Sequence, residues 1–258
     1  MIIKILMLAL FFAVTVGVGV YCRKHATNVN DFVLGGRNVG AWVSAFAYGT
    51  SYFSAVVFVG YAGQFGWSFG LSVVWIGIGN AVLGSYLAWV ILGKRTRLMT
   101  TSLDSATMPD FFAKRYDSKV IRVVVSFVIF VFLVPYSASV YRGLSELFSM
   151  AFGIDVIYCI ILMAVLTGIY VVLGGYIAVA LNDLIQGIIM IISIIAVIFV
   201  VINSKGGLMS SIQQLSQIPS TTTPDLHGAY VSFLGPDPIS LIAVLILTSL
   251  GTWGLPQM

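Results

Sequence analysis

The sequence predicts an all-α membrane protein that crosses the bilayer several times. Of its 258 residues, 59% are hydrophobic and only 9% are charged, whereas soluble proteins carry about 25% charged residues. The hydrophobic residues form long runs, and the short stretches between the runs hold most of the lysines and arginines. This composition excludes a soluble enzyme. The distribution of positive charge is typical of a membrane protein and not of a nucleic-acid-binding protein.

The number of spans follows from the lengths of the hydrophobic runs. A bilayer core of about 30 Å needs about 20 mostly apolar residues per helix, and we therefore predict seven transmembrane helices in a single membrane domain. The fourth run is long enough to tilt, and Pro135 in its middle should bend it. The runs are residues 2–22, 43–65, 70–93, 120–148, 156–175, 178–202 and 238–258.

The positive charges predict the orientation. Ten of the 13 lysines and arginines lie in the loops after the first and third runs, and three, Lys4, Arg142 and Lys205, lie on the other side. Because Lys and Arg are enriched in cytoplasmic loops, we expect the N-terminus outside. Residues 1–22 also fit a signal peptide, but the heavier charge after this run favours a retained helix.

Two connections are long enough to hold structure of their own. Residues 100–118 are amphipathic and should form a short helix on the cytoplasmic surface, entered at Pro109. Residues 203–237 are rich in Ser, Thr, Gly and Pro and should form an irregular extracellular connection. At the outer end of the fourth run, Arg142 and Glu146 are spaced i, i+4 and should pair on one face.

Two spans are interrupted by glycine and polar residues at mid-membrane depth. Unwound helix is tolerated in a bilayer only where it lines a cavity or is buried in protein. Interrupted helices in corresponding positions of two halves indicate the binding site of a transporter. Small residues that allow close helix packing are the alternative interpretation. The predicted break positions are Gly49 in the second span and Gly251, Gly254 and Pro256 in the seventh.

Groups near the second span's break are candidates for binding. If the helix opens, the carbonyls of Thr50 and Phe53 become ligands for a small hard cation. The side chains of Ser51, Tyr52 and Ser54 are then candidates for contact with a polar solute.

Asp183, near the start of the sixth span, has two interpretations. Placing an ionisable group in a membrane helix costs at least ~2.5 kcal/mol, so the first hypothesis for such a group is a functional role. Near a helix N-terminus, however, the dipole favours a carboxylate by ~0.3–1 kcal/mol, so Asp183 is equally explained as a cap.

The sequence holds no phosphate-binding GxxxxGK[ST] loop and no intramembrane pair of His with a carboxylate, so we do not expect an enzyme. His25 and His227 lie in loops, and Cys22 and Cys159 are far apart in the sequence. No metal site other than the candidate cation site at the second span is expected.

Three stretches resemble the sodium/solute symporter family, which contains the sodium/proline, sodium/pantothenate and sodium/glucose symporters. They are residues 31–37 (DFVLGGR), 173–183 (LGGYIAVALND) and 253–257 (WGLPQ). They occur in the family's order and at the corresponding spans. The resemblance covers essentially all of this chain, but only the N-terminal half of a family member.

The resemblance implies sodium-coupled uptake by alternating access, in a five-plus-five inverted-repeat (LeuT-type) core. Residues 1–22 would be an extra N-terminal helix, 43–202 the first five-helix repeat, and 238–258 the truncated first helix of the second repeat. The C-terminal half would be missing, and we expect the 258-residue chain alone not to sustain uptake. The implied partners are Na⁺ as coupling ion, a small solute and the lipid bilayer of the cell membrane, with no organic cofactor.

The family's functional residues match particular positions here. The resemblance assigns sodium to the carbonyls of Thr50 and Phe53 and to Asp183. It assigns the solute cavity to Tyr136 and to the seventh-span residues Thr252, Trp253 and Gln257. The chain departs from the proline branch, which carries an acidic residue in place of Tyr52 and aromatic residues in place of Thr248 and Thr252. These departures disfavour proline as the solute.

Two other interpretations stay open. In one, the chain is a non-transporting membrane fragment or scaffold, and the interrupted helices have no binding role. In the other, it belongs to a proton-coupled or channel-like carrier, and the cation site serves a different ion.

Overall fold

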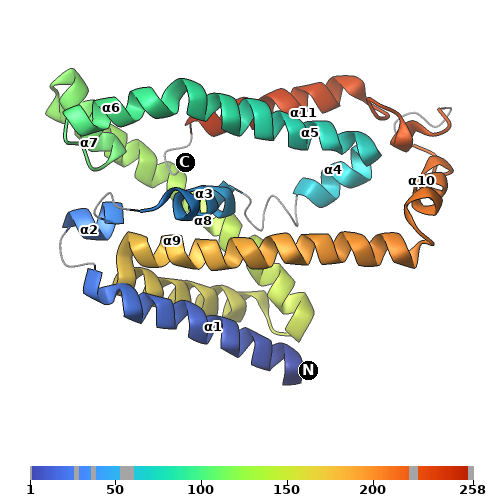
Figure 1. Ribbon diagram of the computed structural model, residues 1–258, viewed down its shortest axis with the longest axis horizontal. Helices are drawn as coiled ribbons and strands as arrows, with labels where there is room; N and C mark the ends of the chain where they lie inside the picture. The colour runs from blue at the N-terminus through green and yellow to red at the C-terminus, as the bar shows by residue number, and fades with distance from the viewer. Residues whose placement is uncertain (1, 26–28, 36–38, 53–60, 221–225, 255–258) are drawn as a thin grey trace. The chain divides into compact units, whose positions relative to one another are not determined.

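The computed structural model describes residues 2–25, 29–35, 39–52, 61–220 and 226–254, and every regular element in these ranges is a helix (Figure 1). The all-α prediction is confirmed for this part of the chain. The helices are α1 (Ile2–Cys22), α2 (Val29–Leu34), α3 (Ala41–Tyr52), α4 (Ala62–Phe69), α5 (Val74–Gly79), α6 (Lys94–Ser102), α7 (Met108–Tyr116), α8 (Lys119–Phe152), α9 (Val156–Ser204), α10 (Leu208–Ser216) and α11 (Pro238–Gly251). The described ranges also contain four 3-10 helices (Arg23–His25, Gly70–Val73, Ala229–Val231 and Thr252–Gly254) and two π-helices (Asn80–Tyr86 and Trp89–Gly93).

Four helical stretches within the described ranges are long and apolar enough to cross a membrane: Ile2–Cys22, Ala62–Ser102, Lys119–Phe152 and Val156–Ser204. Pro238–Gly254 is apolar but shorter. The chain is therefore suited to a multi-pass arrangement, and the count of seven spans stays a prediction.

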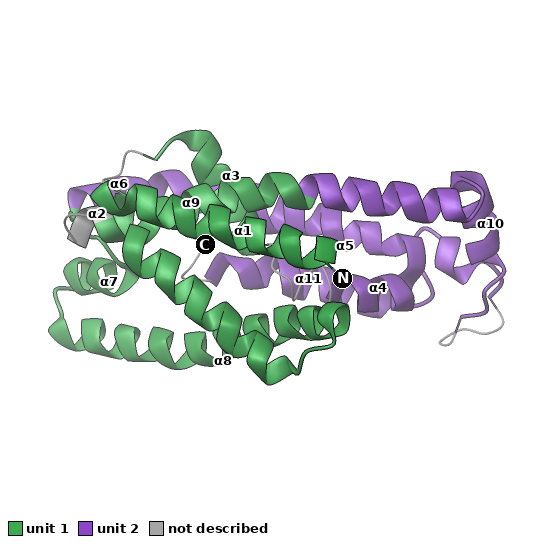
Figure 2. Ribbon diagram, turned by 90° about the horizontal axis from the view of Figure 1, so that it is seen from below, with its two compact units in different colours: residues 1–57, 103–190 green, residues 58–102, 191–258 purple. Residues whose placement is uncertain are grey.

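The chain divides into two compact units (Figure 2). Unit 1 contains residues 1–57 and 103–190, and unit 2 contains residues 58–102 and 191–258. The boundary at residue 190 falls inside α9, so this helix belongs to both units.

Gly175 interrupts α9 in unit 1. Its φ of 58° and ψ of −153° are not helical. Figure 1 shows α9 as two stretches joined by a reversal of the chain. This combination of angles is essentially restricted to glycine. A Cβ at this position would also lie 2.9 Å from the backbone oxygen of Phe32. The break falls at the boundary between the fifth and sixth predicted spans.

The two stretches of α9 on either side of Gly175 both contact α1. A Cβ on Gly19 would lie 3.0 Å from the Cα of Tyr170, and a Cβ on Gly174 would lie 2.9 Å from the backbone oxygen of Gly19. Beyond the break, Asn182 Nδ2 donates to the backbone oxygen of Thr15 at 3.3 Å. Small residues and one interhelical hydrogen bond thus pack α1 against the break, as is usual between membrane helices.

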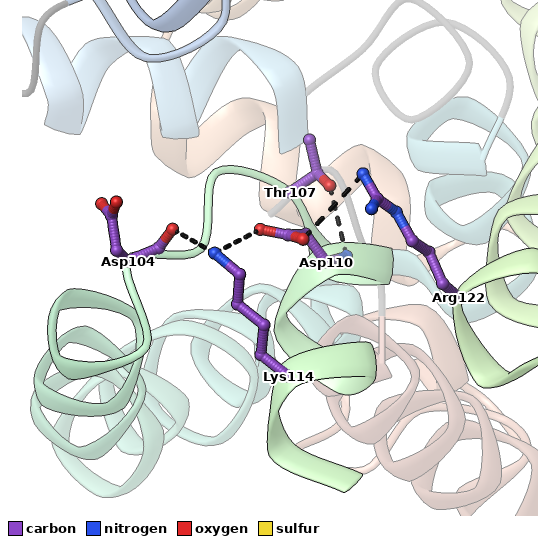
Figure 3. A network of polar contacts seen from close by, with 5 residues as sticks. All are labelled: Asp104, Thr107, Asp110, Lys114 and Arg122. Atoms are coloured by element: carbon purple, nitrogen blue, oxygen red, sulfur yellow. Dashed lines mark hydrogen bonds and ion pairs between the residues drawn. The ribbon is translucent and has the colours of Figure 1, made fainter. Parts of the chain in front are cut away.

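A polar network holds α7 against the start of α8 (Figure 3). Thr107 caps α7 by accepting from the Asp110 amide at 3.3 Å. Lys114 Nζ contacts Asp110 Oδ2 at 3.1 Å and donates to the backbone oxygen of Asp104 at 2.6 Å. Arg122 of α8 reaches Asp110 Oδ1 at 4.0 Å. The predicted short helix is confirmed, with Pro109 in its first turn.

Unit 2 is organised around α5 and α11. Phe69, Ile76 and Leu241 are buried together at its core. Gly70 separates α4 from the helix that follows, with a φ of 62°. A Cβ there would lie 2.8 Å from the Cα of Tyr230. As at Gly175, a helix break coincides with close approach of another segment's backbone.

Two expectations about connections were wrong in part. Residues 94–102, assigned to a loop, continue the helix as α6, because Lys and Arg are good helix formers. Residues 203–237 are not wholly irregular. They contain α10, in which Leu208, Ile212 and Leu215 share one face, and the 3-10 helix Ala229–Val231.

Two expectations about α8 concern single residues. The pairing of Arg142 with Glu146 is confirmed, with Nε and Oε1 3.0 Å apart. Pro135 lies inside α8, and the bend expected at this residue stays a prediction.

We predict that Gly175→Ala destabilises the protein by about 1–3 kcal/mol, because alanine strongly disfavours the required backbone angles. Gly168→Ala is the matched control. Gly168 lies in the same helix, a Cβ added to it would have no other atom within 4 Å, and the substitution should gain about 0.5–1 kcal/mol in helix propensity. Thermal unfolding in detergent measures both variants. Equal melting temperatures would contradict the structural role of the break.

The segment from Asp104 to Arg122, which contains α7, is called the corner below. Its stability should depend on pH through Asp110. Its hydrogen bond to Lys114 is the largest cause that holds the pKa of Asp110 below its ordinary value. The stabilisation is therefore present above the ordinary carboxyl pKa of about 3.9 and is lost as the pH falls through the lowered value. We predict that the corner resists proteolysis to below about pH 4.

Lys114→Gln should raise the pH at which the corner loosens, because Asp110 then titrates nearer its ordinary range. Lys119→Gln, an exposed neighbour at the start of α8, is the control and should leave that pH unchanged. An identical transition in the wild type and in Lys114→Gln would show that the ion pair has no such effect.

Candidate functional site

Thr50 lies in the last described turn of α3 and presents its hydroxyl along the helix. Its Oγ1 lies 2.7 Å from the backbone oxygen of Phe46 and 3.3 Å from that of Ala47. A hydroxyl has one proton and two lone pairs. When the proton is donated to Phe46, the lone pairs of Thr50 remain available for another group.

Asp183 of α9 lies next to Thr50. Their side chains are neighbours, and the Asp183 carboxylate is half-buried. One turn further along α9, Gly187 allows α3 to approach closely. A Cβ on Gly187 would lie 2.6 Å from Cδ1 of Phe46 and 2.9 Å from Cγ2 of Thr50. The absence of a side chain at Gly187 therefore lets Thr50 reach Asp183.

The pair has the chemistry of a partial site for a hard cation. The carboxylate supplies negative charge, and the Thr50 hydroxyl supplies lone pairs while its proton stays on a backbone oxygen. A carboxylate in a membrane-spanning helix is costly unless it is paired or takes part in an ion pathway. Thr50 and Asp183, two of the three predicted sodium ligands, are thus brought together within unit 1.

Two residues next to this pair were not predicted from the sequence. Tyr170, on the other side of the Gly175 break, interacts electrostatically with Asp183. Asn182 is 1% exposed, and its Oδ1 has no hydrogen-bond partner among the described residues. Gly187 was also missed, although its i+4 spacing from Asp183 was a usable signal.

The other predicted residues of unit 1 lie on α3 and α8. Gly49 lies within regular helix, three residues before the described part of α3 ends. Ser51 is exposed, and the ring of Tyr52 stacks on Tyr48 with centroids 6.2 Å apart. Tyr136 on α8 is 38% exposed, and the contacts of the described residues do not link it to Thr50 or Asp183.

The predicted residues of unit 2 lie where α11 gives way to a 3-10 helix. Gly251 is the last residue of α11, and Gly254 ends the 3-10 turn. Thr252 Oγ1 lies 3.2 Å from the Gly84 oxygen and 2.8 Å from the Ser249 oxygen. Trp253 Nε1 donates to the Leu83 oxygen at 2.8 Å. Regular α-helical winding thus ends at the predicted position.

Four predicted residues lie outside the described part of the chain. They are the sodium ligand Phe53, the solute contacts Ser54 and Gln257, and the break residue Pro256. Their roles stay predictions.

Comparison with known proteins identifies the family. The profile of the sodium:solute symporter family matches residues 32–258, which is most of the chain. The chain belongs to the sodium:solute symporter family. The resemblance drawn from the three sequence stretches is thereby confirmed.

Related symporters from Staphylococcus aureus are similar to this member of the family along nearly its whole length. Sodium/proline symporters of strains JH9, Mu3 / ATCC 700698 and USA300 are each 32% identical to it over 254 residues. The match covers 97% of this chain and 46% of each relative, so the chain spans about half the length of these curated relatives. No solved structure matches the chain significantly.

We predict that Gly187→Leu destabilises the protein by about 1–3 kcal/mol, because the new side chain overpacks the contact with Phe46 and Thr50. Gly168→Leu, in the same helix but in open space, should be nearly neutral. Thermal unfolding of both variants tests the contact. Similar stabilities would mean that α3 does not pack on α9 at Gly187.

Proposed function

We propose that this symporter-family chain takes part in sodium-coupled transport of a small organic solute across the cell membrane by alternating access. The observation that carries the proposal is the close approach of α3 to α9 at Gly187, which places Thr50 beside Asp183. Family membership supplies the context, because a carboxylate next to a hydroxyl inside a membrane helix is suited to a travelling cation. Sodium is here a transported ion and not a resident cofactor.

Sodium is proposed to contact the Asp183 carboxylate and the oxygens of Thr50, with the carbonyl of Phe53 as a further ligand. Thr50 offers its carbonyl as well as its hydroxyl if the helix opens beyond Tyr52. The carboxylate attracts the ion, and the neutral oxygens replace its hydration. Because the site has a single negative charge, binding stays weak enough for release to the other side.

The solute is proposed to be a small polar organic molecule. The candidate contacts predicted from the sequence are Ser51, Tyr52, Ser54, Tyr136 and Gln257. The relatives are named as sodium/proline symporters, so L-proline is the first solute to test. Tyr52, Thr248 and Thr252 depart from the proline branch and favour a different solute. The N-terminus is proposed to face the outside.

The experiment is uptake into proteoliposomes that contain the complete gene product. Uptake of radiolabelled L-proline, followed by other small amino and organic acids, is measured with a sodium gradient, a potassium gradient and a proton gradient. We predict uptake of at least one of these solutes with the sodium gradient only. A proton gradient that replaces sodium would favour the proton-coupled carrier.

Variants connect this activity to the proposed site. Asp183→Asn removes the charge and should raise the sodium concentration for half-maximal uptake at least about tenfold, the equivalent of about 1.4 kcal/mol. Thr50→Val should have a smaller effect in the same direction, and Thr50→Ser should restore the wild-type value. Asp155→Asn is the matched control, because Asp155 Oδ1 only accepts from the Ile157 amide near the start of α9, a role that Asn fills equally well. Unchanged sodium dependence in Asp183→Asn would reject this site.

A further inference from the structure

The first π-helix changes the hydrogen bonding of the backbone near α11. The amide of Leu87 donates to the oxygen of Val82, five residues back. In an α-helix the same amide would donate to Leu83, four residues back. The carbonyl of Leu83 therefore loses its α-helical donor within an apolar stretch suited to cross the membrane.

Side chains from the end of α11 donate to the carbonyls at this position. The indole Nε1 of Trp253 donates to the Leu83 oxygen at 2.8 Å. The single hydroxyl proton of Thr252 is shared between the Ser249 oxygen at 2.8 Å and the Gly84 oxygen at 3.2 Å. Thr252 is 9% exposed, so water does not readily replace it. In lipid an unsatisfied carbonyl costs several kcal/mol, and the Trp253 indole removes much of that cost at Leu83.

Close packing brings the donors within reach. A Cβ on Gly84 would lie 3.2 Å from both the Ser249 oxygen and Thr252 Oγ1, and a Cβ on Gly79 would lie 2.6 Å from Leu245. One turn before Gly84, Asn80 Nδ2 donates to Thr248 Oγ1 at 3.1 Å. The hydroxyl of Thr248 in turn donates to the Val244 oxygen at 2.8 Å.

These contacts form a continuous ladder between the two elements. Asn80 bonds to Thr248, Gly84 to Thr252, and Leu83 to Trp253. Asn80 and Gly84 are about one helical turn apart, as are Thr248 and Thr252, and the Leu83–Trp253 bond adjoins the Gly84–Thr252 contact. The ladder ends where α11 becomes a 3-10 helix.

We propose that Thr252 and Trp253 are positioning residues: they fix the 3-10 end of α11 on the Leu83 and Gly84 carbonyls of the π-helix and do not contact the solute directly. The two protons that would be donated to a solute, on the Thr252 hydroxyl and the Trp253 indole, are already donated to backbone oxygens of the protein. The two residues act on transport by setting the direction in which the chain leaves α11. That consequence for transport rests on the proposed function, whereas the anchor itself does not.

The test is hydrogen–deuterium exchange of backbone amides in residues 81–93 of the complete gene product, measured without solute. Trp253→Phe keeps an aromatic ring but removes the donor, and Thr252→Val keeps the side-chain shape but removes the hydroxyl. Each should raise the exchange rates about three- to tenfold, as expected for the loss of one buried hydrogen bond. Thr252→Ser retains the hydroxyl and should restore the wild-type rates.

Trp67→Phe is the matched control for the tryptophan. Trp67 lies on α4 in the same unit and is 82% exposed, so its substitution should leave exchange in residues 81–93 unchanged. Wild-type exchange in both Trp253→Phe and Thr252→Val would overturn the proposal. So would equal exchange in Thr252→Val and Thr252→Ser. Because no ion or solute is needed, this result is independent of whether sodium-driven uptake is found.

A second readout separates positioning from direct contact. With a solute that supports uptake in the proteoliposome assay, Trp253→Phe should lower the maximal rate and leave the half-saturating solute concentration within about twofold of wild type. A tenfold or larger rise in that concentration, with a maximal rate like that of wild type, would show direct solute contact and overturn the proposal.

Discussion

Backbone N–H and C=O groups find no water in the hydrocarbon core of a bilayer, so each departure from α-helical bonding in a spanning segment needs a partner nearby. The described structure meets this requirement in two ways. At Gly70 and Gly175 the chain turns where another backbone approaches closely, and only glycine leaves room for both the angles and the contact. At the first π-helix, the indole of Trp253 donates to the Leu83 carbonyl, which has lost its α-helical donor.

The candidate sodium site depends on the same constraint. The turn at Gly175 starts a new helical stretch, and Asp183 lies about two turns into it. Gly187, one turn beyond Asp183, lets α3 approach until Thr50 meets the carboxylate. A glycine break and a glycine contact therefore bring together a charge and a hydroxyl that are more than a hundred residues apart in the sequence.

Local chemistry made several features predictable from the sequence. The pairing of Arg142 with Glu146 follows from helical spacing, and the helix entered at Pro109 follows from its capping residues. Thr50 and Asp183 were predicted to be site residues because they are polar residues in apolar runs and because they match the family resemblance. Their mutual contact was not predictable, because it depends on how two distant helices pack at Gly187.

Other features were out of reach for physical reasons. Nothing in residues 80–86 distinguishes a π-helix from an α-helix, since the choice depends on donors that α11 supplies. The hydrogen bonds of Thr252 and Trp253 were equally out of reach, because a sequence shows polar groups but not the groups to which they bond. The helical character of residues 94–102 was missed because positive charge was taken to mark a loop.

The central claim is that Asp183 and Thr50 form a sodium site, and the most direct measurement is the effect of sodium on thermal stability. A ligand that binds only the folded state raises the melting temperature as its concentration rises above the dissociation constant. The account predicts that sodium raises the melting temperature of the purified protein more than potassium does at equal ionic strength, and that Asp183→Asn removes this difference. Equal shifts for the two ions in the wild-type protein, or a sodium-specific shift that persists in Asp183→Asn, would contradict it.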